Sequence, residues 1–108
     1  MDQLWFGTRN GLNKYNGNSF EVFRNDPQDD TSISNSDILT ILAAKDGFIW
    51  VGTYSGLNKY DPRKDSFKRY YKRIAEKNSL SNNTIICSTE MPDGELWFGT
   101  SNGISIYN

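Results

Sequence analysis

The chain has 108 residues and a formal net charge of -1, with 12 Lys and Arg against 13 Asp and Glu, which is room for one small domain. The absence of His excludes a His-based triad, a His proton shuttle and a His metal site. The single cysteine, Cys87, excludes an internal disulfide and a zinc site built on several thiolates, so we expect neither a metal nor a cofactor.

Charge and hydropathy narrow the class of partner. The near-balanced charge argues against nucleic acid as the partner. No apolar run approaches the ~20 residues of a membrane span. The start, MDQLWFG, has neither a basic region nor an apolar region of the kind that signal peptides carry. We therefore expect no membrane contact by this segment and no targeting signal in it.

In chain order, the first clear feature is a repeat. It reads LWFGTRNGLNKY at 4–15, IWVGTYSGLNKY at 49–60 and LWFGTSNGISIY at 96–107, with starts 45 and 47 residues apart. The Trp, both Gly, the Thr and the Tyr are common to all three. The two-residue difference falls in one turn, between Tyr60 and Phe67, which a stacked repeat tolerates. A period in the mid-forties is typical of four-stranded propeller blades or of helical solenoids.

The second repeat predicts its four strands most clearly. Ile38–Ala43 is apolar throughout, as expected of a strand buried on both sides. The Asp46-Gly47 pair after it predicts a type I′ hairpin turn, in which both residues have positive φ. The three further strands, separated by turns at 54–56 and at Asp61-Pro62, are Phe48–Thr53, Leu57–Tyr60 and Ser66–Tyr71, the last of them polar as an outer strand should be.

The same pattern extends over the whole chain. Turn signals every 8–12 residues leave no window for an ordinary helix, and the one weak candidate is a single turn at 71–77. The sequence therefore predicts an all-β fold of ten strands, a partial β-propeller of about two and a half four-stranded antiparallel blades in a single domain, 1–108. Residues 1–24 form a blade without its first strand, 37–71 a complete blade, and 84–108 a blade without its last strand.

A closed propeller has typically four to eight blades. We therefore expect a fragment of a larger propeller that is marginally stable alone or that associates.

The repeat resembles the two-component regulator propeller repeat. The residues that carry the resemblance are the pattern D-G-x-[IL]-W-[VF]-G-T-x-x-G-L-N-K-Y at 46–60, its relatives at 4–15 and 93–107, and the S-[IL]-S-N step at 32–35 and 79–82. The resemblance implies the periplasmic sensor region of a bacterial hybrid two-component regulator that responds to carbohydrate breakdown products. It also implies a periplasmic or extracellular place within a membrane-anchored parent protein.

Tryptophan stacks on sugars, which favours a binding site at the repeated motif. Its regular recurrence instead indicates that each Trp packs blade against blade, while the Gly two residues later permits close approach. This structural core consists of Trp5, Gly7, Trp50, Gly52, Trp97 and Gly99.

Three other features have a functional and a structural interpretation. Eight of the twelve basic residues lie in Lys59–Lys77 among aromatics, which could form a nucleic-acid surface but is typical of a solvated edge strand. Asp26, Asp29 and Asp30 lack the spacing of a calcium loop and are interpreted as a polar connection. Cys87 lies in an apolar strand, so we expect an inert buried thiol.

If a surface binds a ligand, propeller topology favours one rim. There the turns between the second and third strands of each blade adjoin the connections 25–36 and 72–83. The turn residues differ between otherwise similar repeats, so they are not needed by the blade itself. The candidate ligand contacts are Arg9, Asn10, Tyr54, Ser55, Ser101 and Asn102.

We therefore interpret the chain as a non-catalytic, ligand-sensing propeller fragment of a two-component sensor whose parent recognises carbohydrate-derived ligands. One alternative is a structural fragment that self-associates through exposed blade faces and edges and so mediates protein–protein contacts. The other is a propeller enzyme of the streptogramin-lyase type, which the absence of His disfavours.

Overall fold

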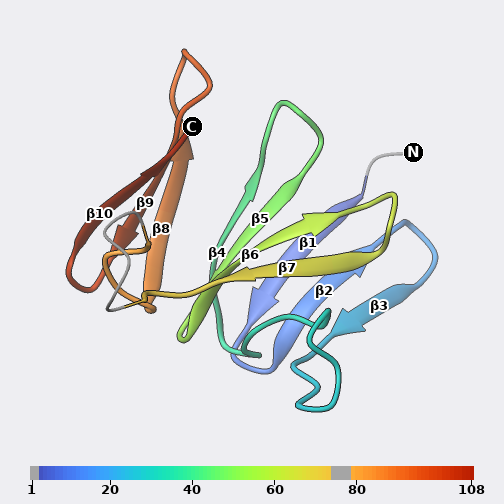
Figure 1. Ribbon diagram of the computed structural model, residues 1–108. Helices are drawn as coiled ribbons and strands as arrows, with labels where there is room; N and C mark the ends of the chain where they lie inside the picture. The colour runs from blue at the N-terminus through green and yellow to red at the C-terminus, as the bar shows by residue number, and fades with distance from the viewer. Residues whose placement is uncertain (1–2, 74–78) are drawn as a thin grey trace.

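The computed structural model describes residues 3–73 and 79–108 (Figure 1). Within these residues the chain forms ten β-strands and no helix, and so no helix that could span a membrane. The helical turn expected at 71–77 lies largely outside the described residues. The strands are β1 (Leu4–Thr8), β2 (Gly11–Tyr15), β3 (Phe20–Phe23), β4 (Ile38–Ala43), β5 (Ile49–Thr53), β6 (Gly56–Asp61), β7 (Ser66–Tyr70), β8 (Ile85–Glu90), β9 (Leu96–Thr100) and β10 (Gly103–Tyr107).

The strands form three antiparallel sheets that follow one another along the chain. The first sheet is β1-β2-β3, the middle sheet is β4-β5-β6-β7, and the third is β8-β9-β10. Figure 1 shows the sheets fanned out, with β4 of the middle sheet in contact with both β1 and β8. The all-β partial propeller of ten strands predicted from the repeat is confirmed.

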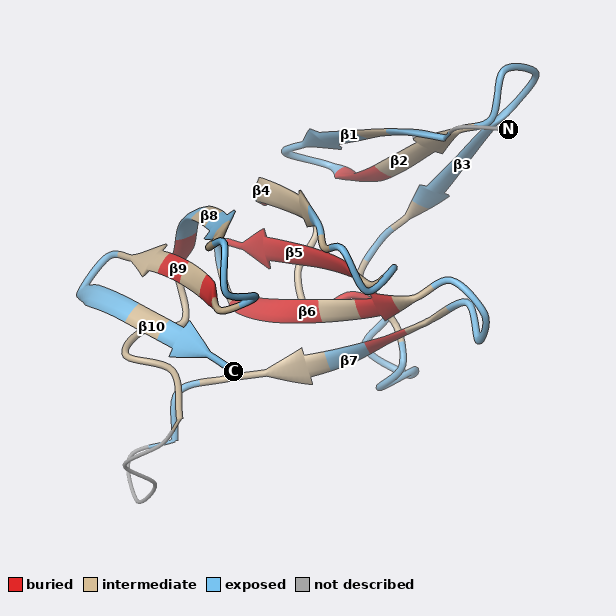
Figure 2. Ribbon diagram, turned by 90° about the horizontal axis from the view of Figure 1, so that it is seen from above, coloured by how far each residue is buried: buried red, intermediate tan, exposed pale blue. Residues whose placement is uncertain are grey.

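Two hydrophobic clusters hold the three sheets together. Between the first and middle sheets, the buried side chains include Leu12, Val51, Tyr60 and Phe67. Between the middle and third sheets, Trp50 packs at the centre of the second cluster. Every residue of β5 is buried because its two faces serve both clusters, whereas most of β10 is exposed (Figure 2).

The repeated Trp and Gly explain how closely the sheets approach. Trp5 lies edge-on to Tyr60 of the next sheet with ring centroids 5.4 Å apart. Trp50 contacts Tyr107 at the equivalent position, with the rings tilted and their centroids 4.9 Å apart. A Cβ on Gly52 would lie 2.5 Å from Cγ2 of Ile85. A larger residue at this position would therefore force the sheets apart.

The hairpin between β4 and β5 differs from the prediction. Gly47 has a φ of 95°, but Asp46 does not have a positive φ. The prediction of a type I′ turn is therefore wrong, because that turn needs a positive φ at both residues. The Gly47 N–H donates to the Ala44 carbonyl, and the Ala44 N–H donates to the Phe48 carbonyl. Asp46 Oδ1 accepts from the Phe48 N–H at 3.1 Å. This side-chain bond stabilises a longer turn in which only glycine needs positive φ.

Two burial expectations were also wrong. The register of β4 against β5 shifts between Ile38 and Thr40, and the bulged residue, Leu39, is 39% exposed. The strand is therefore not buried on both sides. Cys87 is exposed rather than buried. Its counterpart one repeat earlier, Thr40, bonds to Ser88 of the third sheet at 2.7 Å, so Cys87 points away from the middle sheet, where no described residue covers it.

Candidate functional site

The turns at one end of the three sheets are locked by the repeated Thr. In the middle sheet, the Thr53 hydroxyl donates to the Gly56 carbonyl at 2.9 Å and accepts from the Ser55 N–H at 3.0 Å. The equivalent pairs at Thr8 and Thr100 have distances of 2.8 to 3.1 Å. Because the backbone is fixed in this way, the two residues between Thr and Gly are free to vary.

The connections between sheets bind to these turns. The Gly11 N–H donates to the Ser36 carbonyl at 2.7 Å, and the Tyr54 N–H donates to the Asp37 carbonyl at 3.0 Å. Thr84 donates through its hydroxyl to the Tyr54 carbonyl and accepts at its carbonyl from the Ser101 N–H. The three turns and the two connections therefore form one continuous rim, as the propeller topology predicts.

The six candidate contacts lie along this rim. Arg9, Asn10, Tyr54, Ser101 and Asn102 are exposed and Ser55 is half-buried. Tyr54 has 62% of its surface exposed, compared with 38% for Tyr107. The hydrogen bonds found at these six positions involve their main-chain atoms, so within the described part of the chain their side chains are unpaired.

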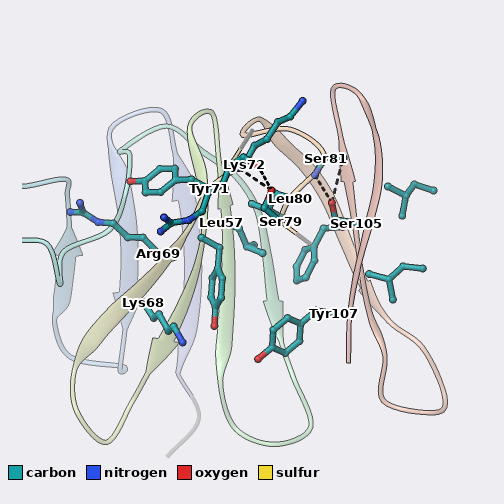
Figure 3. Close-up of a pocket in the computed structure, with 15 residues that line it drawn as sticks. Leu57, Lys68, Arg69, Tyr71, Lys72, Ser79, Leu80, Ser81, Ser105 and Tyr107 are labelled. Atoms are coloured by element: carbon teal, nitrogen blue, oxygen red, sulfur yellow. Dashed lines mark hydrogen bonds between the residues drawn. The ribbon is translucent and has the colours of Figure 1, made fainter. Parts of the chain in front are cut away.

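A second recess lies between β7 of the middle sheet and β10 of the third, with a volume of about 890 Å³ (Figure 3). We call it the β7–β10 groove. Its floor includes Leu57, Leu80 and Phe98, and Tyr70 and Tyr107 stand in its walls. Sequence reasoning missed this groove. The signal that could have found it is the absence of a fourth strand after β10.

One wall of the groove is basic and aromatic. Lys68, Arg69, Lys72 and Arg73 line it (Figure 3), and the Lys68 ammonium lies 5.3 Å from the centroid of the Tyr70 ring. Burial, together with the neighbouring Tyr107 hydroxyl, raises the pKa of Tyr70 to about 12. Tyr70 is therefore neutral at physiological pH and offers the groove a hydrogen-bonding hydroxyl rather than a charge.

The basic segment is not simply a solvated edge. Arg69 donates to the carbonyls of Ser32 and Asp29 at 2.8 and 2.9 Å and thereby fastens β7 to the first connection. Lys59 lies 4.1 Å from the centroid of the Phe48 ring, a cation–π contact. Two of the basic side chains predicted to be solvated are thus used within the fold.

The acidic segment makes local contacts. Asp29 Oδ1 accepts from the N–H and the hydroxyl of Thr31 at 2.9 and 2.7 Å, and these bonds lower the pKa of Asp29. Asp26 Oδ1 caps the Gln28 N–H. No group of three metal-ligating side chains occurs in residues 3–73 and 79–108.

Of the repeated Trp residues, Trp97 alone has no further sheet beside it in the described structure. It is half-buried, and its Nε1 donates to Glu95 at 3.3 Å.

The fold is that of propeller blades, and comparisons with known proteins define it further. The family model "Two component regulator propeller" matches residues 32–55 and 79–102. Over 34 residues the chain is 59% identical to Histidine kinase P4 of Formosa agariphila, a match that covers 32% of this chain and 2% of that protein.

Two solved structures from B. thetaiotaomicron are similar over nearly the whole chain. The extracellular domain described as that of the hybrid two component system BT3049 has a TM-score of 0.82 and 28% identity, and the match covers 98% of this chain and 15% of that one. For the extracellular domain described as that of the one component system BT4673, the TM-score is 0.80, the identity 22% and the coverages 97% and 14%. The second likeness, at this identity, concerns the fold alone.

The chain is thus a β-propeller segment that is similar to parts of the extracellular domains of two solved bacterial proteins. More particularly, two of its three repeats match the family model of the two component regulator propeller. It spans about one seventh of the length of the solved domains that it matches.

Proposed function

We propose that this propeller segment is a non-catalytic sensor module, placed outside the cytoplasm in a membrane-anchored two-component regulator, and that its rim contributes contacts to a carbohydrate-derived ligand. The observation that carries the proposal is the rim itself. Three turns have the same Thr-locked backbone, yet the side chains between Thr and Gly differ and are unpaired within the described residues.

The chemistry of these side chains suits a sugar. The exposed ring of Tyr54 offers a flat apolar face, on which the C–H face of a pyranose can stack. Arg9 and Asn102 supply donors and an acceptor for hydroxyl groups. Since each turn contributes one or two such groups, a ligand of several sugar units would contact turns of several blades.

A site shared between blades binds weakly when only three blades are present. We expect oligosaccharides to bind this chain with a Kd of about 1 mM or weaker, and to shift backbone resonances at the rim turns only. The measurement is a titration with an oligosaccharide panel followed by two-dimensional NMR. Binding in the micromolar range, or shifts confined to the opposite end of the sheets, would contradict the proposal.

Matched variants separate a specific contact from general weakening. Tyr54→Ala and Asn102→Ala should each reduce the ligand-induced shifts of the other rim resonances severalfold. Asn18→Ala makes the same change as Asn102→Ala at an exposed turn on the opposite end of the first sheet, and it should leave them unchanged.

A second function, association of copies, is favoured by a separate observation. Leu4, Phe6 and Phe20 are exposed on the first sheet, although their counterparts one repeat later, Ile49, Val51 and Phe67, are buried between sheets. Exposed apolar faces of this kind are typical of protein contacts.

Two copies that stack head to tail would bring together six sheets, which lies in the range of closed propellers. Light scattering after gel filtration tests this association. A dimer that Phe6→Glu abolishes and Tyr54→Glu does not would support it, and a monomer at about 1 mM would exclude it.

A further inference from the structure

Two polar side chains lie deep inside the middle sheet. Thr53 and Asn58 are both fully buried, with 0% of their surfaces exposed. Thr53 ends β5 beside the rim turn that carries Tyr54, and Asn58 lies in the neighbouring strand β6. Burying a polar group costs free energy unless it finds a hydrogen-bond partner. The partners of these two side chains therefore show what they hold in place.

Asn58 binds the connection between the first and middle sheets. Its Oδ1 accepts from the Ser34 N–H at 2.9 Å, and its Nδ2 donates to the Ser34 hydroxyl at 2.9 Å. Nδ2 also donates to the Val51 carbonyl at 3.3 Å. Asn58 therefore fastens the connection at Ser34 to strand β5 inside the sheet.

The hydroxyl of Ser34 links Asn58 to the rim turn. Ser34 Oγ lies 3.3 Å from Thr53 Oγ1. Because Thr53 donates its own proton to the Gly56 carbonyl, Ser34 is the donor of this pair. The hydrogen bonds thus run in one direction, from the Asn58 amide through two hydroxyls to the Gly56 carbonyl. Hydrogen bonds in such a chain polarise and strengthen one another.

This network holds Tyr54 from two sides. On one side, Thr53 Oγ1 accepts from the Ser55 N–H at 3.0 Å, which fixes the turn. On the other side, the Tyr54 N–H donates to the Asp37 carbonyl at 3.0 Å, and Asp37 lies three residues beyond Ser34 in the fastened connection. The backbone of Tyr54 is therefore fixed although its ring is exposed.

The third sheet repeats the chain of bonds with a different first residue. Ser105, the counterpart of Asn58, donates to Ser81 Oγ at 3.1 Å and accepts from the Ser81 N–H at 2.9 Å. Ser81 Oγ lies 2.9 Å from Thr100 Oγ1, which donates to its own turn. A serine has a single O–H, so it makes both bonds to the connection but lacks the further bond that Asn58 makes to Val51.

We propose that Asn58 is a positioning residue of the rim, which acts through Ser34 to hold Tyr54 in place for contact with a ligand. Asn58 itself touches no ligand. The role of Tyr54 as a contact rests on the proposed function, whereas the positioning is a property of the unliganded chain. A residue whose backbone is already fixed loses less conformational entropy on binding, so the network makes Tyr54 the rigid contact of the rim.

The test measures backbone motion in the intact chain without a ligand. In the unaltered chain we expect NMR order parameters of about 0.85 at Tyr54 and Ser55, the value of a rigid backbone. Ser34→Ala removes the hydroxyl that links Asn58 to Thr53. It should lower both order parameters and make the N–H groups of Tyr54 and Ser55 exchange with solvent severalfold faster.

Two substitutions at position 58 separate positioning from packing. Asn58→Leu keeps the size of the side chain but removes every bond to the connection. It should make the Tyr54 and Ser55 N–H groups exchange at least about tenfold faster, as expected for the loss of one net hydrogen bond. Asn58→Ser restores the arrangement seen at Ser105 and should keep both exchange rates close to those of the unaltered chain.

Phe67→Leu is the matched control for general weakening of the fold. Phe67 is buried in the first hydrophobic cluster and pairs with Tyr60 towards the other end of β6. The substitution should lower the stability of the chain and leave the order parameters of Tyr54 and Ser55 unchanged.

Three outcomes would overturn the proposal: unchanged motion of Tyr54 in Ser34→Ala, loosening by Asn58→Ser as large as that by Asn58→Leu, or the same loosening in Phe67→Leu. Ser34 is only half-buried, so Ser34→Ala decides the test even where Asn58→Leu does not fold. All of these measurements are made without a sugar. A failure of sugar binding at the rim would therefore contradict the proposed function and leave the positioning result as it stands.

Discussion

The two interfaces between sheets use similar apolar and aromatic residues at equivalent repeat positions, and they differ most at their outer ends. At the first interface, Trp5, Phe23, Tyr60 and Phe67 form a continuous aromatic cluster with ring centroids 4.8 to 6.1 Å apart. At the second, Trp50, Tyr70 and Tyr107 take three of these four positions, and no described residue takes the fourth. The difference shows that the repeated motif builds the inner part of a blade interface, while the outer strand closes it.

The largest contrast is expected when the equivalent tyrosines are truncated. Tyr60→Ala should lower the free energy of unfolding by about 3–5 kcal/mol, because the ring is fully enclosed and a cavity remains. Tyr107→Ala should cost about 1 kcal/mol, since its ring already borders the groove. Denaturant unfolding measures both values, and equal costs would contradict the comparison.

The inner ends of the two interfaces should respond alike to a larger residue at the repeated glycine. Gly7→Ala would place a Cβ 2.5 Å from Cγ2 of Ile38, and Gly52→Ala would place one 2.5 Å from Cγ2 of Ile85. Each substitution should destabilise the fold by about 1–3 kcal/mol through overpacking. The two thermal unfolding curves should shift to a similar extent. A shift seen for only one variant would mean that the interfaces do not share their inner geometry.

The hydrogen bonds of the repeated Thr to its turn should contribute differently to stability in the middle and third sheets. Thr53 is fully buried and Thr100 is half-buried, although both hydroxyls make the same two bonds to their turns. Thr53→Val should cost about 1–3 kcal/mol, because a buried N–H and carbonyl lose their partner. Thr100→Val should cost less, since water can replace the hydroxyl.

The conservative variant Thr53→Ser provides the control because it keeps the hydroxyl. It should retain most of the stability in the same unfolding experiment. A cost as large as that of Thr53→Val would show that the methyl group, and not the lock, matters.

Alkaline pH should weaken both interfaces. Burial, reinforced by a hydrogen bond to Asp65, raises the pKa of Tyr60 well above its usual value, and the pKa of Tyr70 is raised to about 12. The folded state therefore holds these protons more tightly than the unfolded state does. Their stabilising contribution is complete below about pH 10 and is lost as the pH rises through the folded-state pKa values.

Chemical unfolding between about pH 9 and about pH 12 should show a falling free energy of unfolding. Tyr60→Phe should make that decline shallower, because the phenol no longer titrates. A decline as steep as that of the unaltered chain would contradict the assignment to Tyr60.

The sequence predicted the strands and the rim well, because the repeat states their positions three times. The turn after Ile38–Ala43 was wrong because Asp46 uses its carboxylate to bond the Phe48 N–H, a choice that the Asp-Gly pair does not reveal. The exposure of Cys87 follows from a bulge and from which neighbour covers its face, and neither is encoded locally.

The groove could be predicted only in part. Strand counting left the blade at 84–108 without a fourth strand, but it did not indicate that the space would be lined by Lys68 and Arg73. That arrangement depends on β7 of the preceding sheet. The ligand contacts of the rim, including Arg9 and Tyr54, stay predictions that binding experiments must test.

Within the described residues, the second interface has the make-up of the first without its outer strand. The direct measurement is to supply that strand covalently, by replacing Asn108 with a copy of residues 61–71. We expect the free energy of unfolding to rise by about 2 kcal/mol or more, and Tyr107→Ala to become as costly as Tyr60→Ala. An extended chain with unchanged stability and an unchanged cost of Tyr107→Ala would contradict it.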